Sequence, residues 1–184
     1  MKHKNIFAAA TALLLAASLL LITHPGRAVD YRKGIPVGGT PSEQKAALLR
    51  AGAKFLDTQD GTLLYRHRFA GLDCTLQHSD TYAGLLAATF PVRSSWRALE
   101  KDYDRLWDAL YKQYGEPASQ KYAFLHAGLV PDLDEYTELL AGRCDWRSLW
   151  MLPDGAIELS ITANESKECF ATIIWQTKTE TKEE

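Results

Sequence analysis

Three adjacent residues, His78, Ser79 and Asp80, contain the residue types of a serine-hydrolase triad. Consecutive residues at a turn cannot converge on one path for proton transfer, and the chain has no Gly-x-Ser-x-Gly nucleophile turn. Zinc needs three or four convergent ligands, but no Cys-x-x-Cys, His-Glu-x-x-His or paired-histidine spacing occurs. His67 alternates with aromatic residues, which indicates a partly buried structural histidine. The sequence therefore predicts no catalytic residue, no metal site and no cofactor.

The densest acidic segment offers the best candidates for a binding site. Its candidate binding residues are Asp132, Asp134, Glu135, Tyr136 and Glu138. An oxygen-rich loop can hold calcium, but this segment lacks the glycine and the twelve-residue spacing of an EF-hand. Acidic residues are also expected in the first turn of a short helix, because they complement its dipole. Both interpretations remain open from the sequence.

Two further carboxylates, Asp145 and Glu158, lie in predicted strands and could face a cleft together. A pair of this kind is what glycoside cleavage requires. It supports the alternative hypothesis of a small periplasmic hydrolase acting on glycans or peptides.

Cysteines occur at positions 74, 144 and 169, an odd number that leaves at least one thiol unpaired. Cys144 and Cys169 begin the first and third strands of a predicted meander, and they form the candidate disulfide. An intervening strand would hold their Cα atoms about 9.5 Å apart, beyond bridging distance. The disulfide therefore requires that one strand end curls over.

The first 28 residues have the order of a secretory signal peptide. Lys2 and Lys4 precede an uncharged run rich in Ala and Leu, and Gly26-Arg27-Ala28 provides small residues at a cleavage site. We predict cleavage and a periplasmic or secreted location in a Gram-negative bacterium. An uncleaved anchor is the alternative, because the apolar core almost reaches the ~17 residues needed to span a bilayer.

Removal of this leader leaves 156 residues with 18 basic and 23 acidic side chains. This mildly acidic balance disfavours nucleic acid and anionic membranes, which both attract basic surfaces. We expect a protein or envelope component as partner, no nucleic acid and no stable membrane insertion after cleavage. The oligomeric state is not predicted.

The clearest helix signal is Thr40-Pro41-Ser42-Glu43, a capping box with proline in the first helical position. It predicts a helix over 41–51. A second helix is predicted over about 95–114, where apolar residues recur at helical spacing. These are Trp96, Leu99, Tyr103, Leu106, Trp107, Leu110 and Tyr114. The aromatic stripe is interpreted as core packing.

Alternating apolar and polar residues predict seven antiparallel strands. They cover 62–69, 72–78, 82–90, 118–124, 144–152, 156–163 and 169–176. The expected fold class is α+β, with two layers, helices on one face of an antiparallel sheet, and candidate tandem αβββ units. We expect one domain over 29–177, with candidate halves at 40–92 and 94–177, and a disordered tail over 178–184.

Several short motifs resemble an uncharacterised family of exported proteins from Gram-negative gut bacteria. They are Gly34-Ile35-Pro36, Phe69-Ala70-Gly71 with Asp73-Cys74, Phe90-Pro91, Tyr114-Gly115-Glu116-Pro117 and Gly155-Ala156-Ile157. The helix-then-meander unit more loosely resembles the outer-membrane assembly lipoprotein BamE and, in tandem, the β-lactamase inhibitor protein. Those folds imply protein binding through an exposed sheet face. The sequence lacks the lipidated cysteine of BamE, which makes membrane tethering doubtful.

Taken together, these observations predict an exported, non-catalytic binding protein. Its binding surface is expected to be a sheet face or the 125–143 connection, which is long for a loop in a compact domain.

Overall fold

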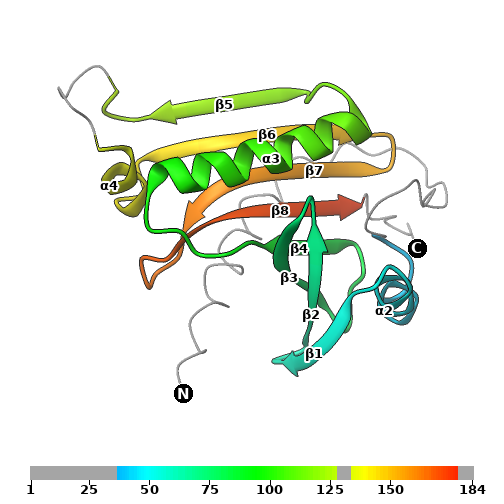
Figure 1. The fold of residues 1–184 in the computed structure, drawn as a ribbon. Coiled ribbons are helices and arrows are strands. Elements are labelled where there is room, and N and C mark those ends of the chain that lie inside the picture. Colours follow the sequence, from blue (N-terminus) through cyan, green and yellow to red (C-terminus); the bar gives the residue numbers. More distant parts are fainter. Residues whose placement is uncertain (1–36, 128–133, 178–184) are drawn as a thin grey trace, which may run out of the picture.

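The computed structural model describes residues 37–127 and 134–177 (Figure 1). The predicted signal peptide (1–28) and the predicted tail (178–184) lie outside the described residues. The described helices are α2 (Pro41–Arg50), α3 (Trp96–Tyr114) and α4 (Glu135–Leu140). The described strands are β1 (Lys54–Gln59), β2 (Thr62–Phe69), β3 (Leu72–Ser79), β4 (Leu85–Thr89), β5 (Ser119–Phe124), β6 (Cys144–Leu152), β7 (Gly155–Ala163) and β8 (Cys169–Thr177).

All eight strands form one open antiparallel sheet in the order β1-β2-β3-β4-β8-β7-β6-β5. In each half of the described chain a helix precedes four strands, with α4 inserted between β5 and β6 in the second half, and the last strands of the two halves pair with each other. Ala88 of β4 is opposite Ile173 of β8 at this join. The expected α+β class is therefore confirmed. The sheet twists strongly, so that β1–β3 run at a steep angle to β5–β8 (Figure 1).

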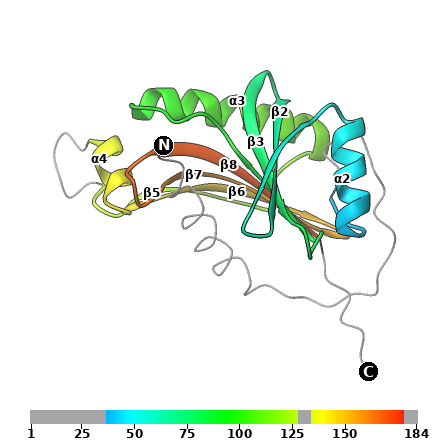
Figure 2. The ribbon, with the colours of Figure 1, turned by 90° about the horizontal axis from the view of Figure 1, so that it is seen from below.

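One face of the sheet forms the core. A single row of side chains crosses six strands on this face, and every member is fully buried. Its members are Tyr65, Leu76, Ala88, Ile173, Leu159 and Ser148. Helix α3 lies over this side of the sheet (Figure 2). Leu48 of α2 belongs to the same hydrophobic cluster, so both helices cover the core face.

Helix α3 buries the predicted apolar stripe almost completely. Trp96, Leu99, Tyr103, Leu106 and Leu110 are buried, whereas Trp107 and Tyr114 are only partly buried against the core. The helix ends at Gly115, whose φ of 79° favours glycine. The stripe therefore packs in the core, except for Trp107 and Tyr114, which are partly exposed.

The capping box of α2 is confirmed. The Thr40 hydroxyl accepts from the Glu43 amide at 3.3 Å, and the Glu43 carboxylate accepts from the Thr40 amide at 2.8 Å. The pKa of Glu43 is lowered by these hydrogen bonds from Thr40.

The expected count of seven strands is wrong, because β1 was not predicted. Its residues do not alternate: Phe55 and Leu56 are adjacent and both exposed. The register shows the reason, since Phe55 pairs with Tyr65 and Asp57 with Leu64, which leaves Leu56 in a bulge. A bulge shifts the two-residue period by one and removes the pattern that identifies a strand.

Candidate functional site

The face of the sheet away from α2 and α3 carries a polar row. The row runs across seven strands through Lys121, Arg147, Ser160, Thr172, Thr89, Thr75 and Arg66. Most of its contacts are internal. The Ser160 and Thr172 hydroxyls lie 2.9 Å apart and form a hydrogen bond. Asp145 forms ion pairs with Lys121 at 2.6 Å and with Arg147 at 3.0 Å. This face therefore satisfies most of its own charges and hydroxyls.

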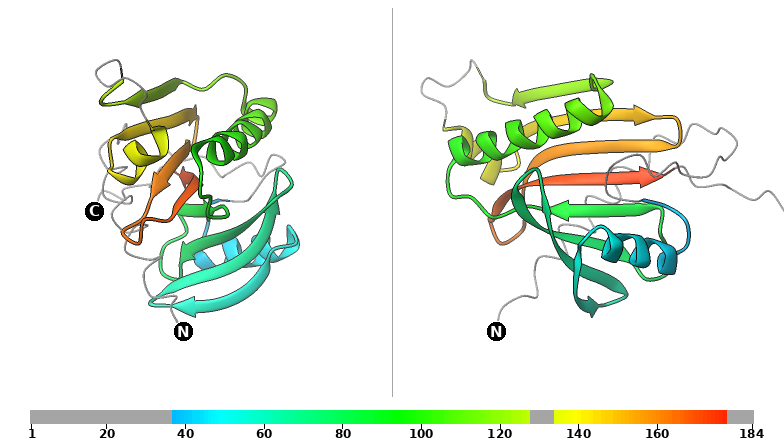
Figure 3. Two further views of the ribbon diagram at one scale, coloured as in Figure 1. Left: turned by 60° about the vertical axis from the view of Figure 1, so that its left-hand side comes forward. Right: turned by 45° about the vertical axis from the view of Figure 1, so that its right-hand side comes forward.

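The two borders of the sheet differ in how well they are protected. Figure 3 shows β1 and β5 at opposite borders. Strand β1 carries the bulge at Leu56, and the Lys45 ammonium lies 4.7 Å from the centre of the Phe55 ring. Bulges and lysines are devices that protect a sheet edge from pairing with another chain. Strand β5 also carries a lysine, Lys121, but it pairs without a bulge from Ser119 to Phe124. The β5 border is therefore the less protected edge of the described sheet.

The backbone of β5 presents hydrogen-bonding groups outward at alternate residues. The Leu125 amide donates to the Arg143 carbonyl at 3.0 Å, in register with the rest of the β5–β6 pairing. In an antiparallel pair, every second residue bonds to its neighbour strand. Lys121 and Ala123 therefore bond to β6, whereas Gln120, Tyr122 and Phe124 direct their amides and carbonyls away from it. No described strand lies on that side.

An aromatic cluster lies directly beneath this border, on the core face. The Trp96 ring is 5.0 Å from Phe124 and 4.9 Å from Trp146, and the Tyr122 ring is 4.8 Å from Trp146. Tyr122 is nevertheless 44% exposed, and Leu125, just beyond the strand, is 69% exposed. The border thus combines open backbone groups with apolar side chains that solvent can reach.

The side of α3 toward β5 carries charged residues of both signs, because Arg97 and Lys101 lie among its acidic residues. Trp96 and Tyr103 fix its orientation, since their rings contact Phe124 and Tyr122 of β5. Glu100, Asp104 and Asp108 follow Trp96 at intervals of four residues along this side. Burial and the nearby charge of Asp108 raise the pKa of Asp104. Within the described ranges, these three carboxylates form no ion pair with a cation.

The predicted acidic segment becomes the start of α4. Asp134 is the N-cap: its carboxylate accepts from the Tyr136 amide at 3.2 Å and from the Thr137 hydroxyl, and these hydrogen bonds lower its pKa. The Tyr136 hydroxyl donates to the Arg93 carbonyl at 3.0 Å. Glu135 is exposed. Asp132 lies outside the described residues. Asp134 and Tyr136 thus hold α4 in place.

Glu138 is the buried acid of this segment. Arg143 donates two hydrogen bonds to its carboxylate, at 2.6 and 3.0 Å, and His126 lies 3.4 Å from it. The hydrogen bonds from Arg143 lower the pKa of Glu138, and the positive charge of Arg143 acts in the same direction. This pair links the last turn of α4 to the residue that precedes β6. The prediction that these residues bind a ligand remains untested.

The two carboxylates of the hydrolase hypothesis lie on the same face of the sheet, with their backbones offset along the strands. Glu158 is opposite Leu149, and Asp145 precedes Leu149 by four residues, or about 13 Å of strand. Paired glycosidase carboxylates lie about 5–9.5 Å apart. Burial and, to a smaller extent, the charge of Asp145 raise the pKa of Glu158, as a catalytic acid would require, although Arg147 and a hydrogen bond from Ser160 oppose this. The backbone offset alone does not bring the two carboxyl groups together, and Arg147 and Lys121 already pair with Asp145.

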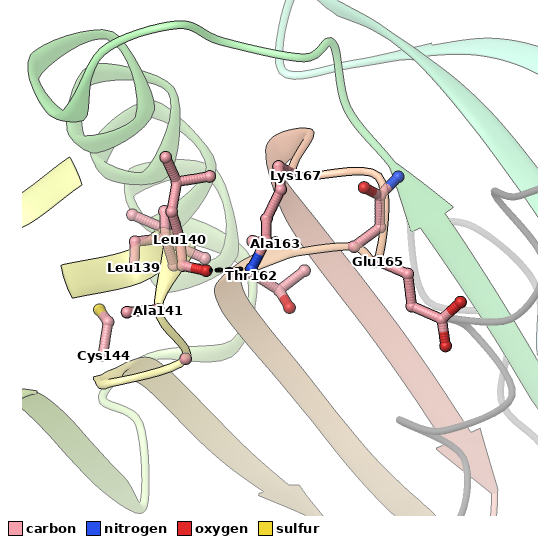
Figure 4. A pocket seen from close by; sticks show the side chains of 11 residues that line it. Leu139, Leu140, Ala141, Cys144, Thr162, Ala163, Glu165 and Lys167 are labelled. Atoms are coloured by element: carbon pink, nitrogen blue, oxygen red, sulfur yellow. Dashed lines mark hydrogen bonds between the residues drawn. The ribbon is translucent and has the colours of Figure 1, made fainter. Parts of the chain in front are cut away.

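A pocket of about 470 Å³ lies between α4 and the turn after β7 (Figure 4). Leu139, Leu140, Cys144, Ala163 and Lys167 are among its lining residues. The Lys167 ammonium donates to the Leu140 carbonyl at 2.8 Å, so its charge is already engaged. Neither Asp145 nor Glu158 lines this pocket.

The histidine and cysteine side chains occupy structural positions. His78 is buried. Its ring forms one hydrogen bond with the Tyr65 hydroxyl at 3.2 Å and one with the Ser79 carbonyl at 2.8 Å, and burial lowers its pKa.

The thiols of Cys74, Cys144 and Cys169 form no disulfide within the described residues. Strand β7 separates the strands that begin with Cys144 and Cys169, so the candidate disulfide does not form in this structure.

Comparison with known proteins identifies no relative: no family model, curated protein or solved structure matches the chain. The resemblance to exported proteins of Gram-negative bacteria therefore remains a prediction.

In the described ranges, no group of three or more potential metal ligands comes together. None of the helices in this part of the chain is long and apolar enough to cross a membrane.

The sequence analysis did not identify the β5 border as a candidate site. The sequence gives one indication near this border: Glu100, Asp104 and Asp108 are four residues apart, which places three acids along one side of a helix. That spacing is also typical of an ordinary solvated helix face, so only the strand order reveals what lies beside it.

Proposed function

We propose that this chain is an exported, non-catalytic binding protein that engages an extended segment of an envelope protein along the β5 border. The border is defined as the outward backbone of Gln120, Tyr122 and Phe124 with the exposed Tyr122 ring. The observation that carries the proposal is the regular, open edge of β5. An added strand would gain main-chain hydrogen bonds from β5 and side-chain contacts with the exposed Tyr122 ring.

Three features support this border over the other candidate surfaces. The opposite sheet face satisfies its charges internally, through ion pairs of Asp145 with Lys121 and Arg147. The α4 segment uses Asp134 and Glu138 for its own capping and ion pairing. The β1 border is interrupted by a bulge. Leu125, which follows Phe124 directly, is exposed and could extend the contact surface beyond the strand.

Replacement of Gln120 by proline tests the proposal. Gln120→Pro removes one outward amide but leaves the hydrogen bonds from β5 to β6 in place, because the Gln120 amide does not point to β6. Gln120→Ala is the matched control, since it removes the side chain and keeps the amide. Circular dichroism and thermal melting establish that both variants are folded.

Each variant is used as bait for proteins of the envelope fraction. We expect partner recovery with the parent and Gln120→Ala, and about tenfold lower recovery with Gln120→Pro. Equal recovery by both variants would exclude the β5 edge. Turnover of a wall or glycan substrate by the pure parent protein would instead support the hydrolase alternative.

A further inference from the structure

We propose that the segment bound at the β5 border is an amphipathic strand, with apolar side chains at every second position, on the side that continues the core of this protein. This inference rests on the proposed function and specifies the chemistry of the partner. It combines the open backbone of β5 with the way in which the core rows of the sheet end at this strand.

The core face of the sheet consists of side-chain rows that cross from strand to strand. Ile161 of β7 is opposite Trp146 of β6, and Trp146 is opposite Tyr122 of β5. The two neighbouring rows end at Gln120 and Phe124, which lie on the same face of β5 as Tyr122. Directly opposite residues of paired strands place their side chains about 4.5–5.5 Å apart. A strand added to β5 would therefore extend each of these rows by one side chain.

Burial falls along the Tyr122 row toward the border. Ile161 is 4% exposed, Trp146 is half-buried, and Tyr122 is 44% exposed. Phe124, at the end of the next row, is also only half-buried. The aromatic rings that end these rows thus keep surface in contact with water. Burial of this surface against apolar side chains of a partner is favourable.

Helix α3 leaves part of this border uncovered. It packs over β7 and β8 and reaches β5 through two ring contacts, Trp96 with Phe124 and Tyr103 with Tyr122. The exposure of Tyr122 shows that these contacts leave ring surface free. Core-facing side chains of an added strand would lie against this free surface.

The other face of the border favours polar side chains. Lys121 lies between Gln120 and Tyr122 in β5 and points to the face without α2 and α3, where its ammonium pairs with Asp145 at 2.6 Å. Side chains of the added strand on this face would lie beside Lys121 and water. The border therefore selects an alternating segment, apolar toward Tyr122 and polar toward Lys121.

The test measures fluorescence anisotropy with two labelled nine-residue peptides. One has Val and the other Thr at every second position, and both have the same Lys, Glu and Ser residues between. Val and Thr are both β-branched and both favour strands, so the pair differs chiefly in the polarity of one side.

The proteins are the parent, Gln120→Pro, Tyr122→Thr, Gln120→Val and Met151→Thr. Tyr122→Thr removes the exposed ring, and Gln120→Val adds an apolar side chain at the end of the neighbouring row. Met151 is exposed on the opposite face of β6, so Met151→Thr is the matched control for loss of apolar surface elsewhere. Thermal melting establishes that each variant is folded.

We expect the Val peptide to bind the parent about tenfold more tightly than the Thr peptide. Gln120→Pro should lose this binding. Tyr122→Thr should weaken binding of the Val peptide about three- to tenfold, and Gln120→Val should strengthen it about threefold, whereas Met151→Thr should leave it unchanged. Sedimentation velocity of the parent should show a monomer.

The failures are distinguishable. Equal binding of the Val and Thr peptides, lost in Gln120→Pro, would overturn the apolar preference and leave the proposed function standing. Unchanged affinity for the Val peptide in Gln120→Val, or in folded Tyr122→Thr, would also overturn the inference, as would a parent dimer that Gln120→Pro dissociates. No binding of either peptide, or binding unaffected by Gln120→Pro, would overturn the proposed function as well.

Discussion

The Tyr103 hydroxyl of α3 donates a hydrogen bond to the fully buried Ser148 hydroxyl of β6, at 2.8 Å. The same Ser148 oxygen lies 3.0 Å from the Tyr122 hydroxyl of β5. One serine therefore connects the helix to the border strand across the core. This connection fixes the position of β5 relative to α3, and with it the geometry of the proposed binding surface.

Tyr103→Phe should destabilise the protein by about 1–2 kcal/mol, because it leaves the buried Ser148 hydroxyl with one partner fewer. Urea unfolding monitored by tryptophan fluorescence measures the change. Tyr111→Phe is the control, since Tyr111 is an exposed tyrosine of the same helix. If both variants unfold at the same urea concentration, the Tyr103–Ser148 bond contributes no measurable stability.

Trp150→Ala should cost about 3–5 kcal/mol, through the cavity it leaves and the loss of a bond from its indole nitrogen to the Gly115 carbonyl at 2.8 Å. Trp107→Ala should cost less than half as much, because Trp107 is only partly buried and stacks on the exposed Tyr111 ring. Chemical denaturation of both variants gives the comparison. A larger loss for Trp107 would contradict the description of the core.

Glu138 should contribute to stability at neutral pH and lose that contribution in acid. Its folded pKa is held below the ordinary value of 4.5, chiefly by hydrogen bonds from Arg143. A carboxyl with a lowered folded pKa stabilises the fold above its unfolded pKa, and the contribution disappears as the pH falls through the folded pKa.

Glu138→Gln should therefore melt at a lower temperature than the parent at pH 7, and the difference should shrink below about pH 4.5. Scanning calorimetry from pH 3 to pH 7 follows this change. Glu135→Gln, an exposed neighbour in the same helix, provides the comparison. A difference that stays constant over the whole range would exclude the ionised pair as its cause.

The three cysteines should remain reduced in the folded protein. Strand β7 separates Cys144 from Cys169, and burial raises the pKa of the Cys74 and Cys144 thiols to about 12. The thiolate fraction at neutral pH is then very small, so both thiols should react slowly with iodoacetamide. Intact mass after alkylation in denaturant, without reductant, should show three modified cysteines. One modified cysteine would indicate a disulfide.

Local patterns in the sequence were enough to predict most elements of the fold. The Thr40–Glu43 capping box placed the first helix, and alternation placed seven strands. The bulge at Leu56 concealed β1 because it breaks that alternation. Strand order could not be predicted, because the pairing of Ala88 with Ile173 joins residues far apart in the chain.

The candidate site was harder to predict than the fold for the same reason. Acidic residues of the 132–138 segment were visible in the sequence, but their partners were not. Arg143 follows Glu138 by five residues, a spacing that does not by itself indicate an ion pair, and the Ser148 bond to Tyr103 spans 45 positions. An open edge is a property of the assembled sheet, so β5 could be recognised only in the structure.

Amide hydrogen exchange of β5, measured residue by residue by NMR, tests the central claim most directly. In the free protein, the amides of Lys121 and Ala123 should exchange slowly, and those of Gln120, Tyr122 and Phe124 quickly, because only the first two bond to β6. Addition of an extended peptide that binds at this border should slow exchange at the second group. Unchanged exchange at those outward amides, with the peptide bound, would contradict strand addition at the β5 border.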